Sequence, residues 1–271
     1  MHLLLLLVAG AVGGFLAGLV GVGGGIIFGP VLFFTYQAAG VTDPVLTPLT
    51  LGTSLLCTFA ASTSGTVGQW RAGAVDGRTS LVVGALAAVA VVLAGRFVAT
   101  QPWYDKEVFQ VVLGVVLLAV VVRMLTKKDR RDTLSTAGAQ RQPARLAVIG
   151  GAAGTLSALA GIGGGVVLVP AFNGLVRLPL KVAAGTSTAA ITIITAVGVA
   201  TYAVLGLGEP VPSGALGYVD WRGALALALP AVVTARLGVT AAHRMDVRYV
   251  RYSFAAFAAV VAARLLWNAL A

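Results

Sequence analysis

Apolar segments of about 20 residues, the length that crosses a lipid bilayer as a helix, recur along the whole chain. Hydrophobic residues make up 58% of the 271 residues and charged residues only 10%, which is too little polar material to cover a soluble globule of this size. The segments lack the alternating pattern of barrel strands, so their backbone groups must be satisfied within helices. The sequence therefore predicts an all-α polytopic membrane protein.

Ten segments are predicted, in two sets of five. They are 3–20, 26–38, 45–69, 80–99 and 108–125, then 146–160, 166–176, 182–205, 223–241 and 250–268. Four motifs occur in the same order in both sets: Gly21–Gly25 and Gly161–Gly165, Pro30 and Pro170, Gly52-Thr53-Ser54 and Gly185-Thr186-Ser187, and Val75-Asp76-Gly77-Arg78 and Val219-Asp220-Trp221-Arg222. Four matched motifs indicate a duplicated unit, with about eight to ten membrane segments in all.

The two halves, 1–126 and 146–271, are predicted membrane repeats joined by a charged polar linker at 127–145. Because loops rich in Lys and Arg stay inside, we expect this linker in the cytoplasm. Counting crossings from the linker, with the short segments as hairpins, places both termini outside and the two repeats in opposite orientations. If the first two segments of the second half were one broken crossing instead, Arg244 and Arg248 would move outside, against the same rule. Inverted repeats are typical of secondary transporters that alternate access to a midplane site.

Each repeat begins with a helix that three adjacent glycines interrupt, at Gly23, Gly24 and Gly25 and again at Gly163, Gly164 and Gly165. Glycine costs a helix about 1 kcal/mol relative to alanine and accepts positive φ, so we expect a break or hairpin tip at both places. The segments that follow would reach only about 15–20 Å as helices, short of the hydrocarbon core of about 30 Å.

A helix that starts at such a tip presents unpaired N–H groups and a partial positive charge, which suit a small anion. We expect the two tips to face each other near the midplane and to form a site without a buried cation. The alternative is that the glycines only let helices pack closely, as we expect of Gly10, Gly14 and Gly18. Packing alone does not need three glycines in a row, which favours the site.

Two further motifs supply polar side chains. The hydroxyls of Thr53-Ser54 and Thr186-Ser187 could donate to an anion or bond back to a carbonyl one turn earlier, and both interpretations stay open. Asp76 with Arg78, and Asp220 with Arg222, predict a membrane-boundary ion pair or a helix cap, with a gate or proton relay as the alternative. No Asp, Glu or Lys lies deep within a predicted segment, so a buried carboxylate relay is not expected.

Several functional classes are excluded. Gly18–Gly25 lacks the Lys-Ser/Thr of a phosphate-binding loop, and no nucleophile has a His and a carboxylate nearby, so the sequence predicts no enzyme and no catalytic residue. No cluster of ligands predicts a metal or other cofactor. The net charge of +10 is spread among the loops, which indicates membrane orientation rather than nucleic-acid binding. Cys57 is the only cysteine, so no internal disulfide is expected.

The paired motifs resemble the sulfite exporter TauE/SafE family of membrane permeases. The resemblance rests on Gly-Val-Gly-Gly-Gly and Gly-Ile-Gly-Gly-Gly, each followed by a proline and by Gly-Thr-Ser, and it covers residues 5–268. It implies a carrier of the bacterial inner membrane for sulfite, sulfoacetate or a related sulfur-containing or organic anion. The residues that match the motifs, and are therefore implied to bind substrate, are Gly23, Gly24, Gly25, Thr53, Ser54, Gly163, Gly164, Gly165, Thr186 and Ser187.

The expected partners are the small anion and the bilayer, with a coupling proton or cation and a second copy of the chain as further candidates. Two other functions compete with a carrier. A membrane scaffold or accessory subunit would use the glycines for packing alone, and an anion channel would use the same pore without saturation. Saturable uptake and counterflow separate the carrier from both.

Overall fold

The computed structural model describes residues 2–41, 43–99, 101, 103–126, 142–244 and 248–270. These residues form ten helices and one short antiparallel ladder: α1 (His2–Val20), α2 (Gly25–Ala38), α3 (Leu46–Arg71), α4 (Gly77–Ala99), α5 (Lys106–Thr126), α6 (Pro143–Ala160), α7 (Gly165–Gly174), α8 (Leu180–Leu205), β1 (Ala215–Leu216), β2 (Val219–Asp220), α9 (Trp221–Arg244) and α10 (Arg248–Leu270). The predicted all-α fold is confirmed, and each predicted segment is a helix whose ends lie within three residues of the expected ones.

Most of the predicted linker 127–145 lies outside the described residues. Its last residues differ from the expectation, because α6 begins at Pro143 rather than at 146. Proline is favoured in the first turn of a helix, where its missing N–H is not needed. The ladder of β1 and β2 was not predicted, and it closes the loop that leads into α9.

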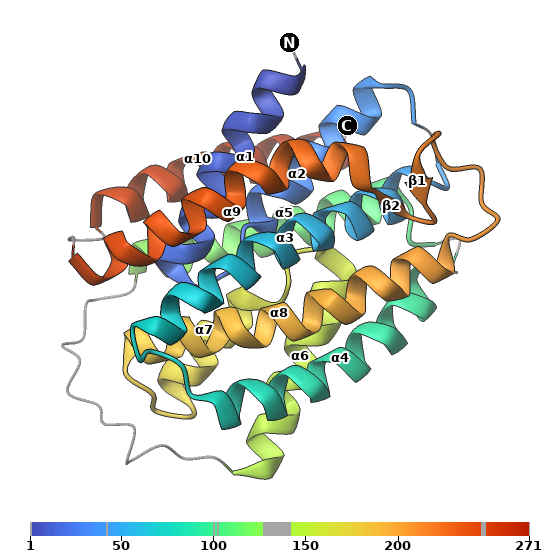
Figure 1. The fold of residues 1–271 in the computed structure, drawn as a ribbon. Helices are drawn as coiled ribbons and strands as arrows, with labels where there is room; N and C mark the ends of the chain where they lie inside the picture. The colour runs from blue at the N-terminus through green and yellow to red at the C-terminus, as the bar shows by residue number, and fades with distance from the viewer. Residues whose placement is uncertain are drawn as a thin grey trace.

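Four long helices, α9, α3, α8 and α4, lie side by side in that order across one face of the molecule (Figure 1). The central two, α3 and α8, run antiparallel, since Gly52 of α3 lies against Tyr202 of α8 while Gly65 lies against Thr188. The α1–α2 and α6–α7 units pack against this row through contacts of α1 with α9, α2 with α3, α6 with α4 and α7 with α8. Within the row of four, helices of the two halves therefore alternate.

Glycines bring helices of different halves into backbone contact. Added Cβ atoms at Gly10, Gly14 and Gly18 of α1 would overlap the carbonyl oxygens of Leu227, Ala231 and Ala235 in α9. This confirms the packing stripe that the sequence predicts for α1. In the second half, Gly154 of α6 meets Ala87 of α4 in the same way. The first helix of each half thus packs on the fourth helix of the other half.

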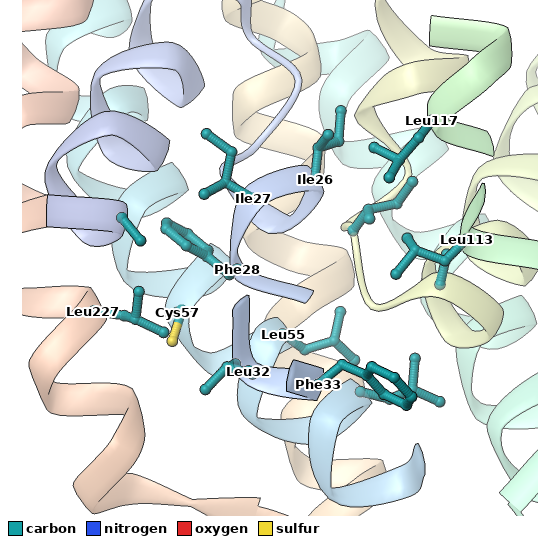
Figure 2. Close-up of a cluster of buried hydrophobic side chains, with 14 of the residues drawn as sticks. Ile26, Ile27, Phe28, Leu32, Phe33, Leu55, Cys57, Leu113, Leu117 and Leu227 are labelled. Atoms are coloured by element: carbon teal, nitrogen blue, oxygen red, sulfur yellow. The ribbon is translucent and has the colours of Figure 1, made fainter. Parts of the chain in front are cut away.

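The short helix α2 is enclosed by apolar side chains from three other helices (Figure 2). Its residues Ile26, Phe28 and Phe33 are almost completely buried. They pack within one cluster with residues of α3, α5 and α9: Leu55, Cys57, Leu113, Leu117 and Leu227. Because lipid tails are as apolar as these side chains, close packing rather than transfer from water holds α2 inside the bundle.

Length and composition separate crossing helices from short ones. Among the described residues, α1, α4, α6, α8 and α9 are long and apolar enough to cross a membrane. At about 1.5 Å per residue, the 14 residues of α2 and the 10 of α7 would reach about 21 and 15 Å, as the sequence predicts. The 26-residue helix α3 is long but less apolar, because it carries buried hydroxyl and amide side chains: Thr47, Thr50, Thr53, Ser54, Thr58, Ser62, Ser64 and Gln69.

Candidate functional site

Both glycine clusters interrupt the helical structure where the sequence predicts. In each half, the first helix ends just before the cluster, and the short helix begins at its fifth residue. Gly23 and Gly163 have φ of +75° and +76°, a conformation that residues with a Cβ rarely adopt. The chain then turns back, since the ring of Phe28 in α2 lies against Gly13 of α1. The predicted hairpin is therefore present rather than a straight, interrupted crossing.

The second and third glycines of each triplet allow two different backbone contacts. A Cβ added at Gly24 or Gly164 would lie 2.9 or 2.5 Å from a carbonyl oxygen of the preceding helix in the same hairpin. A Cβ added at Gly25 would lie 2.5 Å from the Cα atom of Ile162, and one at Gly165 would overlap the carbonyl oxygen of Val22. The two tips therefore touch each other through their backbones. Close packing requires a glycine at the second and third positions of each triplet, whereas the sequence alone favours an anion site over packing as the reason for the triplets.

Thr58 lies at the centre of α3 and contacts both tips. Its Cγ2 methyl is 3.0 Å from a Cβ added at Gly23 or Gly163, and its Oγ1 is 2.8 Å from one added at Gly25. The side chain is completely buried, and its hydroxyl has no hydrogen-bond partner within the described part of the chain. An unpaired polar group therefore stands where the two halves of the molecule meet.

The Thr58 hydroxyl lacks the hydrogen bond that most threonines of α3 and α8 make to their own helix. Six threonines of α3 and α8 donate to the carbonyl oxygen one turn earlier: Thr50, Thr63, Thr188, Thr192, Thr195 and Thr201. The buried hydroxyls of Thr47 and Thr58 instead have no partner among the described residues, and of these two Thr58 contacts the tips. A buried hydroxyl without a partner costs about 1–3 kcal/mol, so this exception calls for a cause such as a ligand or an ordered water. The sequence alone does not single out Thr58, because a lone threonine in a membrane helix usually bonds back to its own backbone.

The predicted Gly-Thr-Ser threonines bind loops of the opposite half rather than the tips. Thr53 Oγ1 accepts a hydrogen bond from the Asp220 N–H at 3.0 Å, and Thr186 Oγ1 accepts one from the Asp76 N–H at 2.9 Å. Each repeat's Gly-Thr-Ser motif thus holds the aspartate loop of the other repeat. The Gly-Thr-Ser motif and the aspartate motif, which are separate in the sequence, are thus hydrogen-bonded to each other, and this contact occurs twice.

The neighbouring serines differ between the halves. Ser54 donates to the carbonyl oxygen of Gly161 at 2.8 Å, which ties α3 to the opposite tip. Ser187, at the matching position of α8, is completely buried, and its Oγ is without a partner among the described residues. Of the four predicted hydroxyls, Ser187 is therefore the one without a partner among the described residues, and Ser54 is the one that contacts a tip.

The two aspartates cap helices, which was one of the predicted alternatives. Asp76 accepts hydrogen bonds from the N–H and the hydroxyl of Thr79 and so caps α4. Asp220 accepts from the Arg222 N–H at 3.0 Å and caps α9, while the Tyr36 hydroxyl donates to its other oxygen at 3.0 Å. The predicted gate residues Arg78 and Arg222 are both exposed, and the Arg222 guanidinium lies over the Trp221 ring.

A family model described as sulfite exporter TauE/SafE matches residues 6–265. The chain belongs to the TauE/SafE family. It is 30% identical over 264 residues to a probable membrane transporter protein of Haemophilus influenzae, with 96% of each chain covered. Probable membrane transporter proteins of Methanocaldococcus jannaschii and Bacillus subtilis are each 26% identical, covering 91% and 92% of this chain and 89% and 91% of their own. No solved structure matches the chain.

Family membership makes this TauE/SafE protein a multi-pass membrane transporter. The buried polar residues that the structure describes are all Thr, Ser or Gln, so the centre of the transporter presents no formal charge there. The same described residues contain no group of His, Cys, Asp or Glu that could hold a metal ion. The charge available near the tips is the partial positive charge of the helix N-termini of α2 and α7.

Proposed function

We propose that this TauE/SafE protein is a secondary transporter of a small anion such as sulfite, sulfoacetate or a related sulfur-containing or organic anion. The observation that carries the proposal is the unpartnered Thr58 hydroxyl at the place where two helix N-termini meet. The first N–H groups of α2 and α7 have no acceptor within their helices, and each N-terminus carries about half a positive charge. Backbone N–H groups and a hydroxyl are suitable donors for an oxyanion, and they require no buried cation.

The transporter is proposed to work by alternating access of two inverted repeats. Two observations support inversion: α3 and α8 occupy matching places in the sequence yet run antiparallel, and the contact of α1 with α9 has its counterpart in that of α6 with α4. Tip-to-tip contact corresponds to a closed arrangement, and separation of the hairpins would admit an anion to Thr58 and the amides. Coupling to a proton or cation would fall to the boundary carboxylates of Asp76 and Asp220.

The proposed location is the bacterial inner membrane, with the 127–145 linker in the cytoplasm and both termini outside. Ser213 tests this topology, because it is exposed in the loop between α8 and α9 that is proposed to lie outside. In a Cys57→Ala background, Ser213→Cys should react with an impermeant thiol reagent from the outside only. Lys181→Cys, at the other end of α8, should react from the cytoplasmic side only. Labelling of Ser213→Cys from the cytoplasm would contradict the inverted topology.

Transport itself is tested with the purified chain in proteoliposomes. We expect saturable uptake of at least one anion among sulfite, thiosulfate and simple sulfonates, and acceleration of uptake by the same anion inside the vesicle. Folded protein without flux of any of these anions, together with a copurifying partner, would indicate a scaffold instead. Flux that does not saturate and shows no counterflow would indicate a channel.

A further inference from the structure

A cleft of about 400 Å³ opens between α3 and α9, near the end of α3 and apart from the glycine tips. Arg71 and Arg236 both line it, and the described residues around it include no acidic side chain. The rest of the lining is mostly apolar, with Val67, Gly68 and Ala72 from α3 and Val239 from α9. Two guanidinium groups therefore share one apolar-walled cleft.

Arg236 is held in place by a buried serine of the neighbouring helix. Its Nε donates to Ser64 Oγ at 3.2 Å, while Ser64 Oγ donates its own proton to the carbonyl oxygen of Val232 at 2.6 Å. Ser64 is only 4% exposed, so this anchor is part of the packed α3–α9 interface. The Ser64 hydroxyl donates its single proton to Val232 and accepts the Arg236 N–H with a lone pair, so both hydrogen bonds have a fixed direction. Within the part of the chain that the structure describes, the terminal nitrogens of Arg236 have no protein partner.

The position of Arg236 is unusual for an unpaired cation. It lies within Trp221–Ala242, a stretch of α9 that is long and apolar enough to cross a membrane. A cation in such a stretch is costly unless it finds a partner, and two like charges at one cleft also repel each other. Among the described residues, neither Arg71 nor Arg236 forms an ion pair. An anion bound between the two guanidinium groups would remove both costs.

We propose that this cleft binds a phosphate-type oxyanion between Arg71 and Arg236. Guanidinium groups match the geometry of phosphate oxygens through paired N–H donors, which a lysine cannot provide. The phosphate group belongs either to an anionic lipid headgroup or to a free anion, and the chemistry of recognition is the same. None of the lining residues belongs to a hairpin tip, so binding here and transport at the tips can be tested separately.

The test uses the full chain, purified in detergent and depleted of lipid, with three probes: phosphatidylglycerol, phosphatidylcholine and inorganic phosphate. Each dissociation constant is obtained from the rise in Tm with probe concentration, because a ligand that binds only the folded protein raises its stability. We expect the Arg71→Gln/Arg236→Gln variant to bind about a hundredfold more weakly, since it loses two charge-assisted hydrogen bonds. Ser64→Ala keeps both charges but frees Arg236, and should bind about tenfold more weakly.

Lys181→Gln is the matched control, because it removes one exposed positive charge on the same proposed face of the membrane. Its affinity should stay within about twofold of the parent. Stabilisation by phosphatidylglycerol alone assigns the anion to a lipid headgroup, and stabilisation by inorganic phosphate assigns it to a free anion. If the double variant does not fold, each single Gln variant should still weaken binding about tenfold.

Three results would overturn the proposed site. They are no response to either anionic probe, a Ser64→Ala variant that binds like the parent, and an equal loss of affinity in Lys181→Gln and the arginine variants. The last result would reduce the cleft to one part of a generally basic surface. The phosphatidylcholine headgroup contains a phosphate but has no net charge. A response equal to that of phosphatidylglycerol would therefore also contradict recognition of an anion.

Discussion

Thr58→Val is expected to lower anion transport about ten- to a hundredfold, and to leave the protein at least as stable as the parent. A hydrogen bond to a charged ligand contributes about 1.5–3 kcal/mol, which accounts for the loss of transport. Valine has nearly the shape of threonine, and it removes a buried hydroxyl that has no partner among the described residues. Proteoliposome flux and Tm, measured on the same preparations, should therefore change in opposite directions or Tm should stay constant.

Thr195→Val provides the matched control for this substitution. The Thr195 methyl lies 3.2 Å from a Cβ added at Gly163, so it contacts the same tip as Thr58. Its hydroxyl, however, donates to the Ile191 carbonyl oxygen at 2.7 Å and is not available to a ligand. We expect flux within about twofold of the parent. Unchanged flux in Thr58→Val would remove Thr58 from the site, and equal losses in both variants would indicate a general effect on packing.

Gly154→Leu is expected to prevent stable folding, whereas Gly151→Leu in the same helix should be tolerated. A Cβ at Gly154 would overlap the carbonyl oxygen of Ala87, so α6 could no longer approach α4. Backbone atoms cannot move aside as a flexible side chain can, and overpacking of a good interface costs about 1–3 kcal/mol or more. Around Gly151, a Cβ would meet no atom within 4 Å.

Size-exclusion profiles and Tm in detergent separate the two outcomes. Gly151→Leu should keep a monodisperse peak with an unchanged or slightly raised Tm, because leucine favours helix by about 1 kcal/mol over glycine. A stable, monodisperse Gly154→Leu protein would show that α6 and α4 pack less closely than described. Since neither residue belongs to the proposed anion site, the comparison concerns the fold alone.

Much of the fold could be predicted because the determining signals are local. An apolar segment near membrane length specifies a helix, and three glycines end it, so the breaks before Gly25 and Gly165 follow directly from the sequence. The glycine stripe of α1 also follows, although the sequence does not say that α9 is its partner. Helix ends were predicted less accurately, with errors of three residues in α4, α6 and α9, because the last turn of a helix depends on caps and tertiary contacts as well as on the apolar pattern.

The site was harder to predict because its contacts join distant parts of the chain. Thr53 was expected to face an anion or its own helix, but it binds the backbone of Asp220, 167 residues away. Thr58 carries no motif, and it is set apart only in three dimensions, by an unpartnered hydroxyl that lies against both tips. The glycine triplets correctly predicted where the helices break, while the contacts of these glycines on several sides depend on how the two hairpins meet.

The packing of α1 on α9 has a consequence for the order of events during synthesis. About 200 residues separate the end of α1 from the start of α9, and a ribosome adds about 5–20 residues per second. The glycine stripe of α1 therefore waits about 10–40 s in the membrane before its own partner helix emerges. During that interval the first half is incompletely packed, and the glycine stripe of α1 is left uncovered and open to contact with any neighbouring helix. Its assembly can be completed only when the second half arrives.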